Sequence, residues 1–256
     1  MNYNNLLNSI IELSNHAGEK ILDIYNSPNT SLKIEYKNDS SPLTIADKAS
    51  NEVIVDGLKN LDCNIPILSE EEKNVEYKIR KKWDIFWLVD PLDGTKEFIK
   101  RNGEFTVNIA LIENGAPIMG VVYAPAINKT WYGLINYGSY LIGKDKKHKK
   151  IALDKSNTEI KKIVSSRSHS NNPKLEEFLK GFEKYELIKM GSSMKMCLVA
   201  DGTAHCYPRF GPTMEWDTGA AHAVVKYACG NIYNIETKKE LNYNKENLLN
   251  PGFIVK

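Results

Sequence analysis

The sequence predicts a layered fold of α-helices and β-sheet. Segments with helical periodicity alternate with short apolar runs, and the middle of the chain has the pattern of an antiparallel meander. The chain has 256 residues, of which 42% are hydrophobic and 26% are charged, so it contains enough apolar material for a sizeable core. This length allows one large domain or two smaller ones.

The first elements alternate between helix and strand. Apolar residues recur at helical spacing over residues 6–24, which predicts a long amphipathic helix that ends at Pro28. We expect a second helix from about Ala46 to Leu61. Residues 65–68 and 85–89 are short apolar runs followed by acidic residues, which is typical of buried strands that present side chains at their ends.

A β-hairpin is predicted next. Residues 106–112 and 117–123 flank the pair Asn114-Gly115, which is a strong signal for a tight hairpin turn. We expect residues 130–135 to add a third antiparallel strand.

The second half again alternates strands and helices. A basic run at residues 144–150 indicates a solvated connection, so we expect two subdomains, residues 1–146 and 147–256. Gly230 is the expected stop of the last helix. The predicted strands are residues 162–165, 186–190 and 204–207, and the predicted helices are residues 173–179, 193–200 and 216–229.

The charge balance argues against a broad surface for polyanions. Lysine and arginine total 34, aspartate and glutamate total 32, and the net charge is +2. A nucleic-acid polymer is therefore not an expected partner, whereas a small anion held at one site is compatible with this balance. Only four of the basic residues are arginine, namely Arg80, Arg101, Arg167 and Arg209. Because arginine carries a rigid bidentate fork, each is a candidate for a specific contact.

The cysteines and the N-terminus indicate a cytoplasmic protein. None of the four cysteines belongs to a CxxC pair, so we interpret them as free thiols rather than zinc ligands or disulfides. The N-terminus lacks the basic region of a signal peptide. No apolar run reaches the roughly 18 residues that a transmembrane helix needs. The sequence carries no signal for an oligomeric state.

The segment WLVDPLDGT, residues 87–95, places two aspartates where a strand ends. The proline between them cannot continue the hydrogen-bond ladder, so we expect the strand to end near Asp90 and Asp93 to converge with it. Gly94 permits close backbone approach, and Thr95 is a candidate cap for a short helix. For this segment alone, a tight turn with an aspartate cap is an equal alternative.

Three further acidic residues occupy similar positions. Glu70 follows a predicted strand, Asp47 opens the second helix, and Asp217 opens the last one. Gathered carboxylates need a cation, because each pair of like charges at about 4 Å repels by about 4 kcal/mol at an effective dielectric of about 20. Oxygen ligands without cysteine or histidine favour a hard cation, so we predict Mg²⁺. The chain lacks the P-loop, HExxH and GxSxG motifs.

The order of four motifs resembles the inositol monophosphatase superfamily of lithium-sensitive, Mg²⁺-dependent phosphatases, and the resemblance covers essentially the whole chain. The motifs are SPLTIAD at residues 41–47, SEE at 69–71, DPLDGT at 90–95 and WDTGAAHA at 216–223. Further segments are most similar to bacterial 3'(2'),5'-bisphosphate nucleotidases of the CysQ type. They are KEFIKRNGEFTVNIA at residues 96–110, SSRSH at 165–169, GSSMKMCLVA at 191–200 and YPRFGPTMEWD at 207–217.

The resemblance implies a five-layer αβαβα sandwich with two or three Mg²⁺ ions in a site between the subdomains. The implied metal ligands are Glu70, Asp90, Asp93, Asp217 and the backbone carbonyl of Leu92. Asp47 and Thr95 match the pair that activates the attacking water, with Asp47 accepting a hydrogen bond from the Thr95 hydroxyl. Glu70 is counted with them as catalytic. Glu71 is either a supporting acid or a solvated neighbour.

The implied substrate is adenosine 3',5'-bisphosphate, which would lose its 3'-phosphate to give AMP, a reaction linked to sulfur assimilation. Its sulfated precursor, 3'-phosphoadenosine 5'-phosphosulfate, is a second candidate. Arg209 would hold the second phosphate, which a simple inositol phosphatase does not need to bind. The implied substrate contacts are Leu92, Asp93, Gly94, Thr95, His169, Ser192, Lys195, Arg209 and Asp217.

Blander interpretations stay open. Arg209 is alternatively a surface ion pair, His169 a capping residue and Arg167 a solvated side chain. An inositol monophosphatase or sugar bisphosphatase of the same superfamily is the alternative function, and a catalytically silent nucleotide or metal sensor is a third. The resemblance further implies inhibition by millimolar lithium and is compatible with peripheral association at the inner membrane.

Overall fold

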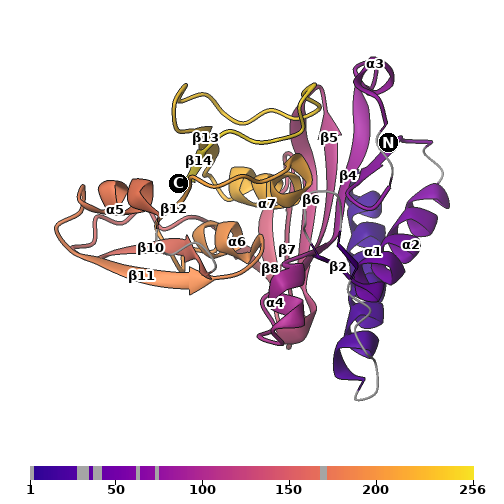
Figure 1. Cartoon of the computed structure of the whole chain (residues 1–256), viewed down its shortest axis with the longest axis horizontal. Helices are drawn as coiled ribbons and strands as arrows, with labels where there is room; N and C mark the ends of the chain where they lie inside the picture. Colours follow the sequence, from indigo (N-terminus) through magenta and orange to yellow (C-terminus); the bar gives the residue numbers. More distant parts are fainter. Residues whose placement is uncertain (1–2, 28–34, 37–41, 62–63, 73–74, 168–171) are drawn as a thin grey trace.

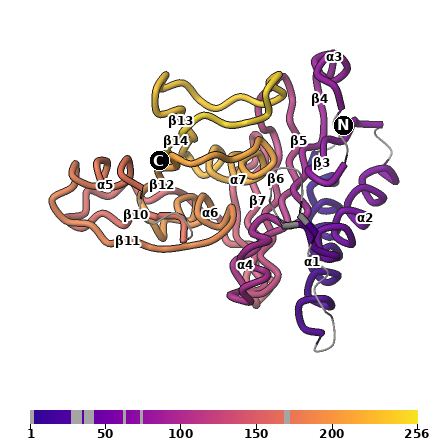
Figure 2. Tube along the Cα trace, viewed as in Figure 1, coloured from indigo at the N-terminus to yellow at the C-terminus, as the bar shows by residue number. Residues whose placement is uncertain are grey.

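The computed structural model describes residues 3–27, 35–36, 42–61, 64–72, 75–167 and 172–256. Its helices and sheets stack in five layers (Figure 1). On one face of a seven-stranded sheet lie α1 (Tyr3–Asn26) and α2 (Ile45–Lys59). On the other face lie α7 (Glu215–Tyr227) and, beside it, α6 (Met194–Ala200) (Figure 2). Smaller sheets and α5 (Pro173–Leu179) complete the order α-β-α-β-α, which confirms the predicted fold.

The large sheet has the order β3-β4-β5-β6-β7-β8-β9, and all its neighbours are antiparallel except β3 and β4. The predicted hairpin is β5-β6, and the predicted third strand is β7. The strands are β3 (Ile67–Ser69), β4 (Ile85–Asp93), β5 (Thr106–Glu113), β6 (Ala116–Ala124), β7 (Lys129–Leu134), β8 (Gly138–Ile142) and β9 (His148–Ile151).

β4 begins with five consecutive apolar residues because both of its faces are buried. Trp87 and Val89 pack with α1 and α2, whereas Phe86 and Leu88 belong to the core cluster that includes α7. Side chains of a strand alternate between the two faces of its sheet, so a strand covered on both sides needs apolar residues at consecutive positions.

The smaller sheets lie beyond α6 and α7. β10 (Lys161–Ser166) pairs in parallel with β11 (Tyr185–Met190). A three-stranded antiparallel sheet has the order β12-β14-β13. A bridge between Ile163 and Cys206 joins the two sheets, and α5 packs on it through Leu175 and Leu179. The strands of the antiparallel sheet are β12 (Tyr207–Arg209), β13 (Ile232–Asn234) and β14 (Phe253–Val255).

The remaining elements are short. None of the helices in the described part of the chain has an apolar stretch long enough to cross a membrane. Cys197, Cys206 and Cys229 are free, as predicted, whereas Cys63 lies outside the described residues. The short elements are β1 (Glu35–Tyr36), β2 (Pro42–Leu43), α3 (Tyr77–Arg80), α4 (Thr95–Ile99) and the 3-10 helix Pro125–Ile127.

Three predictions of secondary structure are wrong in detail. The basic run 144–150 is not only a connection, because its last residues enter the edge strand β9, where the lysines stay exposed as edge strands often require. The predicted strand 204–207 begins only at Tyr207. The left-handed residue that follows α7 is Cys229, with φ 69°, and not Gly230. The two subdomains, 1–146 and 147–256, stay a proposal.

Arg80 makes a specific contact that is structural. Its buried guanidinium donates to Asn244 Oδ1 at 3.0 Å and to the carbonyl oxygens of Lys245 and Glu246 at 2.5 and 2.7 Å. The side chain therefore ties α3, which precedes β4, to a loop close to the C-terminus. Three acceptors arranged around one group need the planar fork of arginine.

Replacing Arg80 with alanine should destabilise the fold. The change removes a buried side chain and leaves three partly buried acceptors without their charged donor, so we expect the free energy of unfolding to fall by about 3 kcal/mol. Urea denaturation measures this difference. Arg101→Ala is the matched control, because Arg101 is exposed and donates to the carbonyl of Tyr25, so it should cost less than about 1 kcal/mol. Equal losses in the two variants would contradict the assigned role.

Candidate active site

Three carboxylates from separate parts of the sequence meet at one edge of the large sheet. Glu70 follows β3, Asp90 lies in β4 and Asp217 lies in the first turn of α7. An oxygen of each lies within 4.8 Å of the other two. The parallel pairing of β3 with β4 brings Glu70 beside Asp90, and α7 packs across β4, β5 and β6.

The strand that carries Asp90 does not end there, which corrects the prediction from Pro91. β4 continues to Asp93 through a bulge: Asp90 pairs with Asn108 and Asp93 with Thr106, so β4 has one residue more than its partner. A bulge tolerates proline because the extra residue needs no ladder hydrogen bond. The bulge carries Leu92, whose N–H donates to Asp90 Oδ1 at 3.1 Å.

Asp47 and Thr95 form the predicted hydrogen bond. The Thr95 hydroxyl lies 3.1 Å from Asp47 Oδ1 and 3.3 Å from the carbonyl oxygen of Leu92. The other carboxylate oxygen, Asp47 Oδ2, accepts from the N–H of Thr44 at 2.7 Å and from its hydroxyl at 2.6 Å, which forms the capping box of α2. The cap therefore fixes the orientation of Asp47. Burial raises the pKa of Asp47 above its ordinary value.

Thr95 does not cap α4, contrary to the prediction. The residue before the helix is Gly94, which adopts a left-handed conformation with φ 94°. A Cβ added at Gly94 would lie 2.9 Å from the carbonyl oxygen of Glu104, so only glycine fits this position. The Thr95 hydroxyl is thereby left to contact Asp47 instead of a backbone N–H.

A pocket of about 140 Å³ opens beside the carboxylates. Asp93 and Asp217 line it, and so do Lys195 and Arg209. Predicted substrate contacts that also line it are Gly94 and Ser192. Residues that the sequence did not single out line it as well, namely Lys96, Glu97, Ser166, Gly191, Ser193, Met196, Tyr207, Thr213, Thr218 and Phe253.

The electrostatics of the acidic residues favour a cation. Burial raises the pKa of Asp93 to about 6, although the nearby Lys195 opposes the rise. Burial and the charge of Asp93 together raise the pKa of Asp217 well above its ordinary value. Without a counter-charge, Asp93 and Asp217 therefore keep their protons to a higher pH than ordinary aspartates do. An all-oxygen donor set with mutual repulsion fits a divalent hard cation.

Two cations complete the pocket. Lys195 is buried, its Nζ donates to the carbonyl oxygen of Ser192 at 2.5 Å, and burial lowers its pKa to about 8. Arg209 donates to the carbonyl oxygen of Pro212 at 3.0 Å. Within the described part of the chain, its buried Nε has no hydrogen-bond partner and its guanidinium forms no ion pair. The surface ion pair considered for Arg209 is therefore not seen among the residues that the structure describes.

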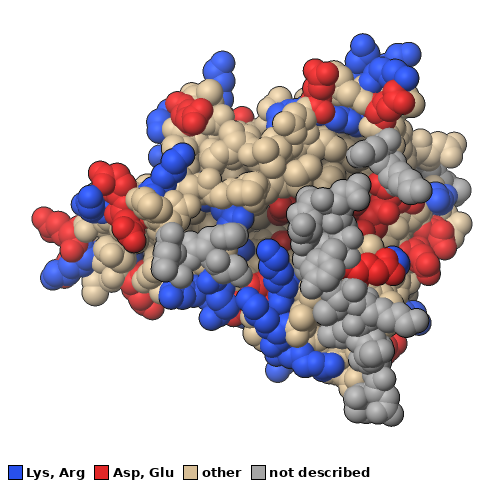
Figure 3. All heavy atoms as spheres, in the orientation of Figure 1, with Lys and Arg blue, Asp and Glu red and all other residues tan. Residues whose placement is uncertain are grey.

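Basic side chains also gather on the face shown in Figure 3, over α4 and the adjoining end of β11. Lys96 belongs to α4, Lys100 directly follows it, and Lys189 belongs to β11. Lys96 is exposed and lines the pocket. A chain with almost no net charge thus presents a local positive field to a small anion.

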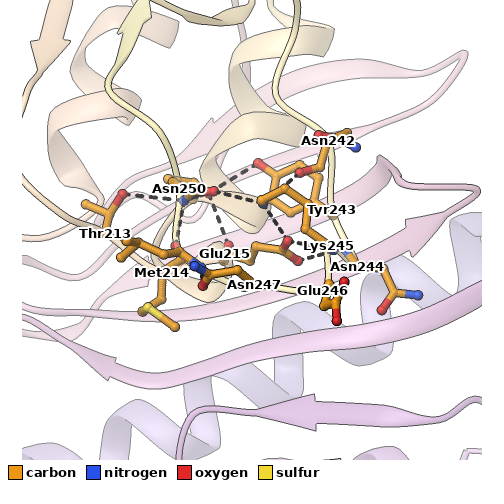
Figure 4. A network of polar contacts seen from close by, with 12 residues as sticks. Thr213, Met214, Glu215, Asn242, Tyr243, Asn244, Lys245, Glu246, Asn247 and Asn250 are labelled. Carbon is orange, nitrogen blue, oxygen red and sulfur yellow. Dashed lines mark hydrogen bonds and ion pairs between the residues drawn. The ribbon is translucent and has the colours of Figure 1, made fainter. Parts of the chain in front are cut away.

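A buried polar network fixes the start of α7 and hence Asp217 (Figure 4). The fully buried Glu215 carboxylate accepts from the N–H of Lys245 at 3.0 Å and from its ammonium at 2.5 Å. Asn250 donates to the carbonyl oxygen of Met214 at 2.8 Å. The N–H of Met214 in turn donates to Asp217 Oδ2 at 2.8 Å. One carboxylate oxygen of Asp217 is therefore oriented by the helix cap.

The chain resembles known proteins over nearly its whole length. The model of the inositol monophosphatase family matches residues 2–254. The chain belongs to the inositol monophosphatase family. It is 43% identical to the 3'(2'),5'-bisphosphate nucleotidase CysQ of Salmonella typhimurium over 98% of this chain and 99% of that one. It is 44% identical to CysQ of Escherichia coli K12, with the same coverage.

Solved structures agree with this membership of the inositol monophosphatase family. The crystal structure of CysQ from Bacteroides thetaiotaomicron superposes with a TM-score of 0.88 at 43% identity, covering 98% of this chain and 97% of that one. An inositol monophosphatase from Thermotoga maritima gives a TM-score of 0.78 at 22% identity, covering 98% and 92%. The second likeness shows the shared fold.

Some residues of the site could not be predicted from the sequence. Ser193 donates its backbone N–H to Asp93 at 2.5 Å, and the spacing of the acids gives no sign of it. Thr44 orients Asp47, and the T-x-x-D capping pattern was the available signal. Arg167 is not merely solvated, because it pairs with Glu104. His169 lies outside the described residues, and both predictions for Glu71, a supporting acid or a solvated neighbour, stay open.

Proposed function

We propose that this chain is a Mg²⁺-dependent 3'(2'),5'-bisphosphate nucleotidase. It hydrolyses the 3'-phosphate of adenosine 3',5'-bisphosphate to give AMP and phosphate, and 3'-phosphoadenosine 5'-phosphosulfate is a second substrate. The observation that carries the proposal is one pocket that combines Asp93 and Asp217 with Lys195 and Arg209, where Asp217 also belongs to the cluster with Glu70 and Asp90. Two relatives that are 43% and 44% identical to this chain carry the name of this activity, which supports the proposal.

The residues that would hold two or three Mg²⁺ ions are the clustered Glu70, Asp90 and Asp217, together with Asp93 and the carbonyl of Leu92. Bound Mg²⁺ supplies charge neutralisation at the phosphoryl oxygens and lowers the pKa of a water. Such help is needed because one side-chain base contributes only about 10²–10⁴-fold in rate.

The protein's own groups position the reactants. The Thr95 hydroxyl donates to Asp47, so its oxygen lone pairs are left to accept a hydrogen bond from the attacking water and aim it. Asp47 has a raised pKa and is suited to hold the proton that the water releases through Thr95. Arg209 and Lys195 bind the second phosphate, and Ser192 and Gly94 lie beside it.

Mg²⁺ should stabilise the fold more at high than at low pH. The pKa of Asp93 is raised to about 6, so the metal-free fold gains stability from this group below its ordinary pKa and loses it as the pH rises to about 6. Bound Mg²⁺ offsets the loss of stability that comes from the ionised Asp93 carboxylate. Below about pH 6, Mg²⁺ must compete with protons for this carboxylate. With Mg²⁺ about 100-fold above its Kd, Tm should rise by about 5 °C or more at pH 8 and far less at pH 5.

Thermal unfolding with and without Mg²⁺ measures this shift. Potassium chloride at equal ionic strength is the control, because it screens charges without binding a carboxylate cluster tightly. An equal rise in Tm at both pH values would show that the acidic cluster is not the binding site.

A substrate panel tests the function. Phosphate release is measured with and without Mg²⁺ from adenosine 3',5'-bisphosphate, its sulfated precursor and inositol 1-phosphate at equal concentrations. We expect Mg²⁺-dependent release that is fastest from the two nucleotides. Faster turnover of inositol 1-phosphate would identify an inositol monophosphatase instead. Tight nucleotide binding without phosphate release would indicate a sensor.

A cytoplasmic location and peripheral membrane association stay predictions.

A further inference from the structure

One carboxylate beside the pocket has no part in the proposed mechanism. Glu104 lies between α4 and β5, and 15% of its side chain is exposed. It accepts from Nε and Nη2 of Arg167 at 2.8 and 2.5 Å, which makes a bidentate pair. Its Oε2 also accepts from the backbone N–H of Gly191 at 2.7 Å. A residue of the first half thus holds two residues of the second.

The backbone that Glu104 holds is tightly packed and strained. A Cβ added at Gly191 would lie 2.7 Å from Cγ of Glu97 and 2.9 Å from Cβ of Glu104, so this glycine lies directly against both glutamates. The next residue, Ser192, has φ 48°, in the left-handed region that side chains other than glycine rarely adopt. A strained conformation persists only where neighbouring contacts enforce it.

The position of Lys195 depends on this same backbone. Its ammonium donates to the carbonyl oxygen of Ser192 at 2.5 Å and lines the pocket. The N–H of Gly191 and the carbonyl of Ser192 are separated by only a few bonds. A shift of this backbone therefore moves the acceptor that holds the ammonium.

Ser193, in contrast, is anchored without Glu104. Its N–H donates to Asp93 at 2.5 Å, its hydroxyl donates to Asn108 Oδ1 at 2.8 Å, and it lies 2.8 Å from the Thr106 hydroxyl. These partners belong to β4 and β5. Loss of Glu104 should therefore release Gly191 and Ser192 but leave Ser193 and Asp93 in place.

We propose that Glu104 is a positioning residue for recognition of the second phosphate. It acts through the Gly191 N–H and the Ser192 carbonyl, which together place the Lys195 ammonium. The proposal rests on the proposed nucleotidase function. Because a nucleoside monophosphate offers no second phosphate to Lys195, Glu104 favours the bisphosphate over the monophosphate and leaves the hydrolytic step itself little changed.

Kinetics of Glu104→Ala with adenosine 3',5'-bisphosphate and with 3'-AMP test this role. We expect the ratio of kcat/KM, bisphosphate over monophosphate, to fall about tenfold, mainly through KM for the bisphosphate. Glu104→Gln should change the ratio less than about threefold, because its amide oxygen still accepts from Gly191. Arg167→Gln removes the ion pair and the contact of Arg167 with the carbonyl oxygen of Lys189, but it leaves Glu104 bonded to the Gly191 N–H, so it should also change the ratio less than about threefold.

Two kinetic outcomes would overturn the proposal. Equal losses with both substrates would mean that Glu104 supports the whole site rather than Lys195. A Glu104→Gln variant as impaired as Glu104→Ala would mean that its charge matters and not its contact with Gly191. Thermal unfolding of each variant verifies that it is folded under the assay conditions.

Hydrogen exchange of the ligand-free protein separates this proposal from the proposed function. In Glu104→Ala, the amides of Gly191 and Ser192 should exchange at least about tenfold faster, whereas those of β5 stay protected. Unchanged protection at Gly191 would refute the positioning role. If the wild-type protein released no phosphate from either nucleotide, the nucleotidase function would fail, and the exchange result would still decide whether Glu104 holds this backbone.

Discussion

Asp90→Asn should abolish Mg²⁺-dependent phosphate release while the protein stays folded. Asp90 is buried and lies within 4.8 Å of the carboxylate oxygens of Glu70 and Asp217. The neutral amide removes one negative charge from the proposed metal site, which costs several kcal/mol of transition-state stabilisation. Since about 1.4 kcal/mol corresponds to tenfold in rate, we expect kcat to fall by about 10³-fold or more.

The fold should tolerate this change. The amide oxygen of asparagine can still accept from the N–H of Leu92, and the loss of one charge relieves repulsion among the acids. In the absence of Mg²⁺ the Tm should therefore stay the same or rise slightly. Asp56→Asn, on the exposed face of α2, is the matched control and should keep full activity. Full activity of Asp90→Asn at saturating Mg²⁺ would rule out its role as a metal ligand.

Thr95→Val should cost about 10²-fold or more in kcat. Valine keeps the shape of threonine but removes the hydroxyl that donates to Asp47, so the water is no longer aimed and its proton has no route to Asp47. Thr95→Ser is the matched control, because it keeps the hydroxyl and should retain most of the activity. Steady-state phosphate release at saturating substrate and Mg²⁺ measures both variants.

Thermal unfolding distinguishes loss of the Thr95 hydroxyl from loss of the fold as the cause of lower activity. Thr95→Val leaves Asp47 Oδ1 without this donor, but Asp47 Oδ2 keeps both contacts with Thr44, so we expect a folded protein with a Tm lowered by about 5 °C at most. A Thr95→Val enzyme with more than half of the wild-type kcat would show that Asp47 and Thr95 do not activate the water. Equal losses in Thr95→Val and Thr95→Ser would point to packing instead of the hydroxyl.

Local patterns were sufficient for most of the fold. Helical periodicity predicted α1, and the Asn114-Gly115 turn predicted the hairpin of β5 and β6. Both signals are local, because burial of one helix face or the geometry of a two-residue turn is written into neighbouring positions. The short apolar run at residues 85–89 likewise predicted a buried strand, which is the first part of β4.

The acidic site was partly predictable for a different reason. Glu70 and Asp90 follow short apolar runs and Asp217 lies at the start of a helical segment, so their types and positions predict a common site. Their approach to within 4.8 Å depends on parallel pairing of β3 with β4 and on α7 packing across the sheet. Neither pairing nor packing is visible in the spacing of the acids.

The arginines mark the limit of the sequence most clearly. The sequence has only four arginines among its many lysines, and it predicted that each arginine is a candidate for a specific contact. Tertiary structure alone decided which contact. Arg80 binds a loop that lies 164 to 166 residues later, Arg167 pairs with Glu104, and Arg209 lines the pocket. The sequence by itself determined the elements and the chemistry available, because these depend on neighbouring residues. The folded chain determined the partners, because groups distant in sequence meet only when the layers pack.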